Sequence, residues 1–210
     1  VLKELNVKRE EIVVTTKIFR VSNDITKKVD VNSEGLSRKH IIEGLNNSLK
    51  RLQLDYVDVV FCHRPDKDTP LEEVVRGMNW VIDQGKAFYW GTSEWPPEVI
   101  TEAIVLCEKL NLHKPVVEQP EYSMLKRNRF EKEYRRVFSE HGYGSTIWSP
   151  LGGGILSGKY NEGKKAEDGR YVTWKLSVLD LYYNSLVNEE NIAKMKKLGE
   201  YAKELGYSQA

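Results

Sequence analysis

One apolar stretch, residues 54–66 (Leu-Asp-Tyr-Val-Asp-Val-Val-Phe-Cys-His-Arg-Pro-Asp), constrains the fold more than any other part of the chain. Its β-branched and aromatic residues suit a strand that is covered on both faces, as in a parallel sheet flanked by helices. Pro65 has no N–H group to donate, so regular strand pairing should stop near His63. His63 therefore stands at the carboxyl end of a strand, where parallel sheets place their ligand-binding loops.

Strands and helices are predicted to alternate along most of the chain. Predicted strands begin near residues 12, 57, 87, 116 and 144, and predicted helices cover residues 37–52, 70–84, 97–110 and 130–141. Repeated β-α units joined by right-handed crossovers predict an α/β fold with a parallel sheet. Five strands cannot close an eight-stranded barrel, so the pattern leaves an open sheet and a partial barrel as alternatives.

Local signals place several helix ends. Ser37 can cap the first helix, and residues 69–72 (Thr-Pro-Leu-Glu) have the pattern of a capping box with proline at the first helical position. Gly85 is placed to end that second helix in a left-handed conformation. Two more helical stretches, near residues 174–183 and 188–205, are predicted after the last strand.

A polar side chain ends each predicted strand, and these residues are Lys17, His63, Ser93, Gln119 and Ser149. A lone strand-end lysine usually lies on the surface, and a lone histidine is more often structural than catalytic. Parallel strands, however, end at one shared edge, so these five side chains should point into one pocket. No Cys or carboxylate stands at zinc-like spacing from His63, so no metal site is predicted. The glycines at 152–154 match neither a dinucleotide-binding nor a phosphate-loop fingerprint.

Composition gives no support to several classes of function. The 210 residues carry 32 basic and 31 acidic side chains, a net charge of +1, so no overall field favours nucleic acid as a partner. Cys62 and Cys107 are the two cysteines, which predicts reduced thiols in the cytosol, with a pairing between them as the alternative. No apolar run is long enough to span a bilayer. The start at Val1, without Met, predicts missing upstream sequence.

Seven stretches form a specific pattern: residues 15–19 (Thr-Thr-Lys-Ile-Phe), 35–45, 54–66, 89–95, 117–122, 148–151 and 157–160. Together they resemble the aldo-keto reductase superfamily, and more narrowly its voltage-gated potassium channel β-subunit branch. The resemblance covers most of residues 1–160. It implies a (β/α)8 TIM barrel that binds NADP(H) in extended form at the carboxyl-terminal rim of the strands. About five of the eight strands would lie in this chain.

The resemblance also implies two catalytic roles. Lys17 matches the lysine whose positive charge lowers the pKa of a proton-donating tyrosine, and His63 matches the histidine that orients and polarises the carbonyl. Some channel β-subunits carry asparagine in place of that histidine, so His63 favours a competent reductase. The family's tyrosine and aspartate would lie before Val1 and its last strand after Ala210. The expectation is thus one barrel domain over residues 1–210 that lacks N-terminal and C-terminal portions.

Cofactor contacts follow from the same resemblance. Ser93 and Gln119 match side chains that hold the carboxamide, and Trp148 matches the aromatic residue near the nicotinamide ring. Trp95 is expected to flank the same pocket. The loop over the pyrophosphate comprises Ser149, Pro150, Leu151, Gly152 and Gly153, and Lys159 and Arg170 would meet phosphate charge. Glu94 stands where animal β-subunits carry arginine. The choice between NADP and NAD stays open, because the segment that grips the 2′-phosphate would lie after Ala210.

Three functions are compatible with this resemblance. The first is NADP(H)-dependent reduction of aldehyde or ketone carbonyls to alcohols, which His63 favours. The second, which the narrow branch favours, is a cytoplasmic regulatory subunit at a membrane potassium channel that senses redox state through bound NADP(H). Relatives in that branch suggest a homotetramer. The third is a catalytically incomplete barrel fragment.

Overall fold

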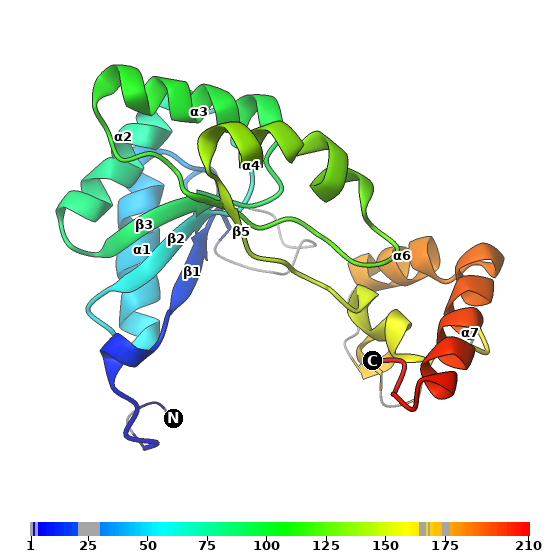
Figure 1. The fold of residues 1–210 in the computed structure, drawn as a ribbon. Helices are drawn as coiled ribbons and strands as arrows, with labels where there is room; N and C mark the ends of the chain where they lie inside the picture. The colour runs from blue at the N-terminus through cyan, green and yellow to red at the C-terminus, as the bar shows by residue number, and fades with distance from the viewer. Residues whose placement is uncertain (1, 3, 21–29, 164–166, 168, 174–176) are drawn as a thin grey trace. The chain divides into compact units, whose positions relative to one another are not determined.

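The computed structural model describes residues 2, 4–20, 30–163, 167, 169–173 and 177–210. The chain forms two compact units (Figure 1). Unit 1 comprises Val1–Gln119 and Tyr134–Thr146, and unit 2 comprises Pro120–Glu133 and Ile147–Ala210. The expectation of one barrel domain over the whole chain stays a prediction.

A parallel sheet organises unit 1. Its strands are β1 (Thr15–Ile18), β2 (Val57–Cys62), β3 (Ala87–Thr92), β4 (Val117–Glu118) and β5 (Gly144–Ser145), paired in the order β1-β2-β3-β4-β5. The helices of this unit are α1 (Arg38–Leu52), α2 (Leu71–Asp83), α3 (Pro97–Leu110) and α4 (Arg135–His141), with short helical turns at η1 (Arg9–Glu11). The prediction of parallel strands separated by helices is confirmed.

Strand order decides between the two sheet alternatives. Neighbours in the sheet are neighbours in the chain, and α1, α2 and α3 lie along one side of the strands (Figure 1). Right-handed crossovers between strands in chain order place every helix on the same face, as in a (β/α)8 barrel. A doubly wound sheet would instead reverse its strand order and place helices on both faces. The prediction of a partial barrel is therefore confirmed.

The core of unit 1 lies between this sheet and its helices. Alternate strand residues face the helices, among them Ile18, Val60, Cys62 and Trp90. They pack against buried residues of the three long helices, namely Ile41, Leu45, Leu49, Val74, Val75, Met78, Val81, Ile100, Ala103, Ile104 and Cys107. The helices α1, α2 and α3 do not cover the opposite face of the sheet (Figure 1).

The helix starts agree with the sequence in one case and differ in another. Ser37 caps α1, because its side chain accepts a hydrogen bond from the backbone N–H of His40 (3.2 Å). The prediction that Thr69 caps α2 is wrong, since the N-cap is Pro70 and makes no side-chain capping bond. Thr69 Oγ1 instead donates to Oδ2 of Asp66 (2.7 Å). The Thr69 hydroxyl is thus turned toward the Asp66 carboxylate, with which it forms a charge-assisted hydrogen bond.

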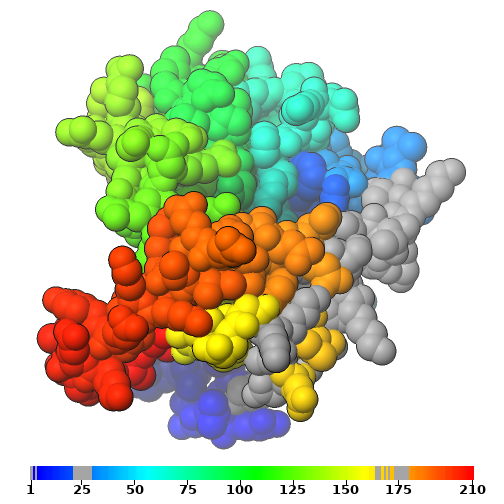
Figure 2. All heavy atoms as spheres, turned by 90° about the vertical axis from the view of Figure 1, so that its right-hand side faces the viewer, coloured from blue at the N-terminus to red at the C-terminus, as the bar shows by residue number. Residues whose placement is uncertain are grey.

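Unit 2 has a helical structure. Its elements are η2 (Arg129–Glu133), η3 (Gly152–Ser157), α5 (Arg170–Thr173), α6 (Ser177–Leu186) and α7 (Glu189–Glu204). Its core comprises Ile155, Leu156, Tyr160, Tyr171, Tyr183, Leu186 and Met195. Figure 2 shows α6 in orange and α7 in red as space-filling atoms.

Both helices predicted for this end of the chain are present. Residues 174–176 of the predicted 174–183 stretch lie outside the described residues, and α6 occupies the rest. The second, α7, begins after Asn188, whose side chain accepts from the N–H of Asn191 (2.9 Å). Over the residues that the structure describes, none of the helices has the length and apolar character needed to cross a membrane.

Candidate active site

The ends of β2, β3 and β4 form one continuous rim. The first residue after each strand donates its backbone N–H to the last carbonyl of the strand before it (His63 to Ile18, 3.0 Å; Ser93 to Cys62, 3.0 Å; Gln119 to Thr92, 2.8 Å). These bonds extend the parallel ladder by one step beyond the strands. The structure thus brings three of the predicted site residues to a common edge, as the sequence predicts.

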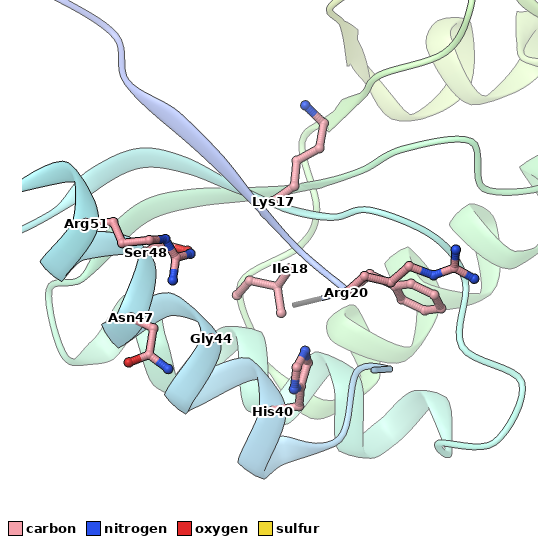
Figure 3. Close-up of a pocket in the computed structure, with 9 residues that line it drawn as sticks. Lys17, Ile18, Arg20, His40, Gly44, Asn47, Ser48 and Arg51 are labelled. Carbon is pink, nitrogen blue, oxygen red and sulfur yellow. The ribbon is translucent and has the colours of Figure 1, made fainter. Parts of the chain in front are cut away.

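Lys17 and His63 share one face of the sheet. Lys17 pairs in register with Phe61, and its Nζ lies 5.5 Å from the centre of the Phe61 ring. His63 follows two residues after Phe61, so strand alternation puts it on the same face. Figure 3 shows Lys17 and Ile18 pointing to opposite sides of the strand. Lys17 and His63 therefore lie on the side of the sheet away from the helices.

The electrostatics of this pair keep the histidine neutral. Partial burial of His63, followed by the positive charges of Arg64, Lys17 and Arg20, lowers its pKa to about 4. Lys17 is exposed at the free edge of the sheet, yet desolvation of part of its side chain and then the charge of Arg64 lower its pKa as well. At neutral pH the imidazole is uncharged and retains one N–H donor for a ligand.

Arg64 is a site residue that the sequence reasoning missed. Its charge acts on both Lys17 and His63, and its Nη1 donates to the backbone carbonyl of His63 (2.6 Å). The signal was available, because Arg64 directly follows His63 in the stretch that organises the sequence. A cation next to a strand-end histidine is a direct way to depress the histidine pKa.

Ser93 and Gln119 are joined to each other. The Ser93 hydroxyl donates to the backbone carbonyl of Gln119 (2.9 Å), and the Gln119 side-chain amide donates to the hydroxyl of Thr146 (2.9 Å). Ser93 is buried, whereas Gln119 is half-buried. The expectation that Trp95 flanks the pocket is wrong, because Trp95 is 1% exposed and belongs to the core beneath the helices.

A turn rich in left-handed conformations begins at Ser149 in unit 2. Ser149 has φ 52°, and φ is 56° at Gly152, 67° at Gly153 and 101° at Gly154. At Gly153 a Cβ atom would lie 2.0 Å from the Tyr171 hydroxyl, so close packing alone excludes a side chain there. Two N–H groups of the turn are used within it, because Gly152 donates to the Ser149 carbonyl (2.8 Å) and Gly154 donates to the Leu151 carbonyl (2.9 Å). The expected contact of this turn with a pyrophosphate stays a prediction.

The remaining predicted residues of unit 2 surround this turn. Pro150 and Leu151 are exposed, and the ring of Trp148 lies 6.2 Å from that of Tyr182. A Cβ atom at Gly154 would lie 2.9 Å from Cε of Lys159, so the Lys159 side chain runs across the turn. The structure thus places Lys159 beside the glycines, and its predicted contact with phosphate stays a prediction.

Arg170 stands at the start of α5, and its side chain lies outside the described part of the chain. Its predicted contact with phosphate therefore stays a prediction. Within the described residues, no group of three or more His, Cys, Asp or Glu side chains gathers where it could hold a metal ion. Both cysteines are free and buried, and burial raises the pKa of the Cys107 thiol to about 11.

A cavity beside β1 is distinct from this rim. It lies between β1 and α1, lined by Lys17, Ile18, Phe19, Arg20, His40, Gly44, Asn47, Ser48 and Arg51. Figure 3 shows Ile18 and His40 on the cavity side, while the Lys17 side chain points away from them. Arg20 is paired with Glu34 (2.7 Å). Lys17 thus belongs to the lining of the cavity, while the end of its side chain points away from Ile18 and His40.

The strand order and helix placement of unit 1 are those of a partial β/α barrel, a fold whose ligand sites lie at the carboxyl ends of the strands. The sequence matches the model of the Aldo/keto reductase family over residues 1–210. The chain therefore belongs to the aldo/keto reductase family, and its fold is that of a partial (β/α)8 barrel.

Relatives give a narrower comparison. The chain is 48% identical over 209 residues to a "Probable voltage-gated potassium channel subunit beta" from Oryza sativa subsp. japonica, and equally to a protein of the same name from Arabidopsis thaliana. These matches cover 100% of the chain and 61% of each relative. A "Putative voltage-gated potassium channel subunit beta" from Schizosaccharomyces pombe (strain 972 / ATCC 24843) is 54% identical over 162 residues, 77% of this chain and 46% of the relative.

Proposed function

We propose that this protein is an NADP(H)-dependent oxidoreductase that reduces aldehyde or ketone carbonyls to alcohols. Membership of the aldo/keto reductase family supports a role in oxidation and reduction. The observation that carries the proposal is the pair formed by Lys17 and His63 at the ends of adjacent strands, with the pKa of His63 lowered to about 4. A cation beside a neutral imidazole suits carbonyl polarisation.

The two residues divide the work on the carbonyl oxygen. When bound, NADPH would supply the hydride that reaches the carbonyl carbon, and the tyrosine that the resemblance implies would donate the proton that reaches the oxygen. Neutral His63 donates a hydrogen bond that orients the carbonyl and stabilises the negative charge that develops on its oxygen. The positive charge of Lys17 favours an anionic oxygen nearby, which is what lowering the pKa of a proton-donating tyrosine requires.

The cofactor contacts fall on residues with suitable chemistry. Ser93 and Gln119, joined by their 2.9 Å hydrogen bond, would hold the nicotinamide carboxamide, with Trp148 beside the ring. The turn from Ser149 to Gly153, including Pro150 and Leu151, would cover the pyrophosphate. Lys159, which lies across that turn, would meet its charge, and Arg170 would add a second cation.

The test is NADPH oxidation by the purified protein with a panel of aldehydes and ketones. We expect steady oxidation that falls by at least about 100-fold in His63→Ala, since positioned acid-base and polarising groups contribute roughly 10²–10⁴-fold. His113→Ala is the matched control, because His113 is an exposed histidine in the segment between α3 and β4 that pairs with Asp83 of α2 at 3.2 Å. Equal losses in both variants, or none in either, would contradict the assignment.

A second function is favoured by the names of the relatives, which are called voltage-gated potassium channel beta subunits. In that case the protein is a cytoplasmic homotetramer bound to a membrane channel, and its NADP(H) reports redox state while reduction is slow. Co-purification with a potassium channel and a tetrameric native mass would support this function. A folded protein that neither binds NADPH nor co-purifies with a channel would be a catalytically incomplete barrel fragment.

A further inference from the structure

An acidic side chain is buried behind the rim of the sheet. Glu118, the last residue of β4, is 0% exposed. Thr92, the last residue of β3, donates its hydroxyl to Oε2 of Glu118, and the Tyr143 hydroxyl lies 2.9 Å from the same Thr92 oxygen. Burying a carboxyl group is costly unless hydrogen bonds compensate. The Glu118 carboxyl is therefore held on the helix side of the sheet by the Thr92 hydroxyl, which in turn contacts the Tyr143 hydroxyl.

The Glu118 carboxyl also reaches the turn that follows β3. The Tyr134 hydroxyl lies 3.4 Å from Oε1 of Glu118. Hydrogen bonds from the backbone N–H groups of Glu94 and Trp95 also oppose the effect of burial on the pKa of this carboxyl. Glu94 has φ 57°, a left-handed conformation that a glutamate rarely adopts. Tyr134 donates its hydroxyl to the backbone carbonyl of Trp95 (2.7 Å). Contacts from behind the sheet thus hold a strained turn in place.

Two residues of the proposed cofactor site, Ser93 and Gln119, adjoin the turn and Glu118 in the sequence. Gln119 directly follows Glu118, and Ser93 directly precedes the turn at Glu94. The two are linked by the hydrogen bond from the Ser93 hydroxyl to the Gln119 carbonyl (2.9 Å). One carboxyl group therefore fixes the backbone on both sides of the Ser93–Gln119 pair.

We propose that Glu118 is a positioning residue that sets Ser93 and Gln119 for the nicotinamide carboxamide. This inference rests on the proposed NADP(H) site, but it concerns a residue on the opposite face of the sheet, which touches neither cofactor nor substrate. Its role is to satisfy the two backbone N–H groups of the turn. Without that acceptor the left-handed conformation of Glu94 loses its support, and the turn relaxes.

Glutamine should replace Glu118 with little loss. Burial raises the pKa of Glu118 to about 7, so a neutral carboxyl is present in part of the molecules at neutral pH. A glutamine carbonyl can accept from the turn in the same way. Its NH2 group can donate to Thr92, whose hydroxyl can in turn donate to Tyr143, because either hydroxyl of that pair can be the donor.

The experiment compares two ligands. NADPH carries the carboxamide, whereas 2′-phospho-ADP-ribose has the same phosphates and adenosine but no nicotinamide. In Glu118→Met, which keeps the volume but loses the acceptor, we expect roughly ten-fold weaker binding of NADPH, the equivalent of about one hydrogen bond. Binding of 2′-phospho-ADP-ribose should stay unchanged. Glu118→Gln should bind both ligands like the parent protein.

Tyr143→Phe is the matched control, because it removes a buried hydroxyl from the same cluster without touching the turn. We expect no change in the ratio of the two affinities. Equal weakening of both ligands in Glu118→Met, or no weakening of NADPH, would overturn the proposal. If Glu118→Met does not fold, Glu118→Asp draws the acid back by one methylene, and the same selective loss is expected.

Amide hydrogen exchange separates this proposal from the proposed function. The amides of Glu94 and Trp95 should exchange faster in Glu118→Met than in the parent protein, and at the parent rate in Glu118→Gln. This readout needs no cofactor. If the parent protein fails to bind NADPH, the proposed function fails. Unchanged exchange at Glu94 and Trp95 would instead refute the positioning role of Glu118.

Discussion

Gly91 is the position where a single added methyl group should disturb the site most. It lies in β3 between Phe61 of β2 and Val117 of β4. A Cβ atom there would be 2.5 Å from the Val117 carbonyl oxygen, 2.6 Å from Val117 Cγ1 and 2.9 Å from Phe61 Cε1. The Phe61 ring in turn supports Lys17, whose Nζ is 5.5 Å from its centre. We therefore predict that Gly91→Ala destabilises the protein and displaces the Phe61 ring that lies beneath Lys17.

The magnitude follows from two opposing effects. Ordinary carbon contacts are about 3.5–4.0 Å, so three neighbours of the new methyl must move, and such overpacking costs about 1–3 kcal/mol. Replacing glycine by alanine also reduces the freedom of the unfolded chain, which stabilises by about 0.4–1 kcal/mol. The net loss for Gly91→Ala should be about 0.5–2 kcal/mol.

Gly144→Ala isolates the packing effect. Gly144 lies in β5, and a Cβ atom there would meet ordinary contacts at 3.4 Å and 4.0 Å. Both variants gain the same stabilisation from the reduced freedom of the unfolded chain. The difference between their unfolding free energies, about 1–3 kcal/mol, therefore reports overpacking alone. In a chain of 210 residues each kcal/mol shifts Tm by about 2–4 °C. Urea unfolding followed by tryptophan fluorescence measures both variants. A Gly91→Ala protein as stable as Gly144→Ala would refute the reasoning.

Two further predictions concern pH and helix capping. Because the folded pKa of His63 is about 4 and its ordinary value is 6.5, the unfolded state binds more protons between these values, and stability should fall as pH drops from 6.5 to 4. Urea unfolding at pH 7 and pH 5 measures the loss of unfolding free energy between these pH values, and this loss should be smaller for His63→Asn than for the parent protein. Equal losses would contradict the lowered pKa of His63. Ser37→Ala should cost about 0.5–2 kcal/mol in the same assay, since Ser37 caps α1 through the N–H of His40, and an unchanged midpoint would contradict that role.

The sequence predicts the architecture well because its signals are local. The β-branched run of β2 and the apolar spacing of the helices identify the elements, and strand-end polarity points to the rim at His63, Ser93 and Gln119. Ser37 could be recognised as a cap because a cap and its partner are three residues apart. These features need no knowledge of which distant residues meet.

The features that the sequence did not predict depend on contacts between distant residues. Thr92 and Glu118 are 26 positions apart, and only the pairing of β3 with β4 brings them together. Thr69 looked like a cap, but the nearby Asp66 also accepts from the N–H of Leu36, 30 residues away, and so is fixed in reach of the Thr69 hydroxyl. Local pattern cannot reveal such competition between partners.

The measurement that tests the central claim most directly is an NADPH titration of the purified protein, followed by quenching of tryptophan fluorescence. Trp148 is half-buried near the glycine turn and is the expected reporter. We predict saturable binding that weakens several-fold in Lys159→Ala, because Lys159 would meet phosphate charge. A control variant, Lys114→Ala, removes a lysine that pairs with Glu108 on the helix side and should bind like the parent. A folded protein that shows no saturable quenching would contradict the claim that this chain is an NADP(H) oxidoreductase.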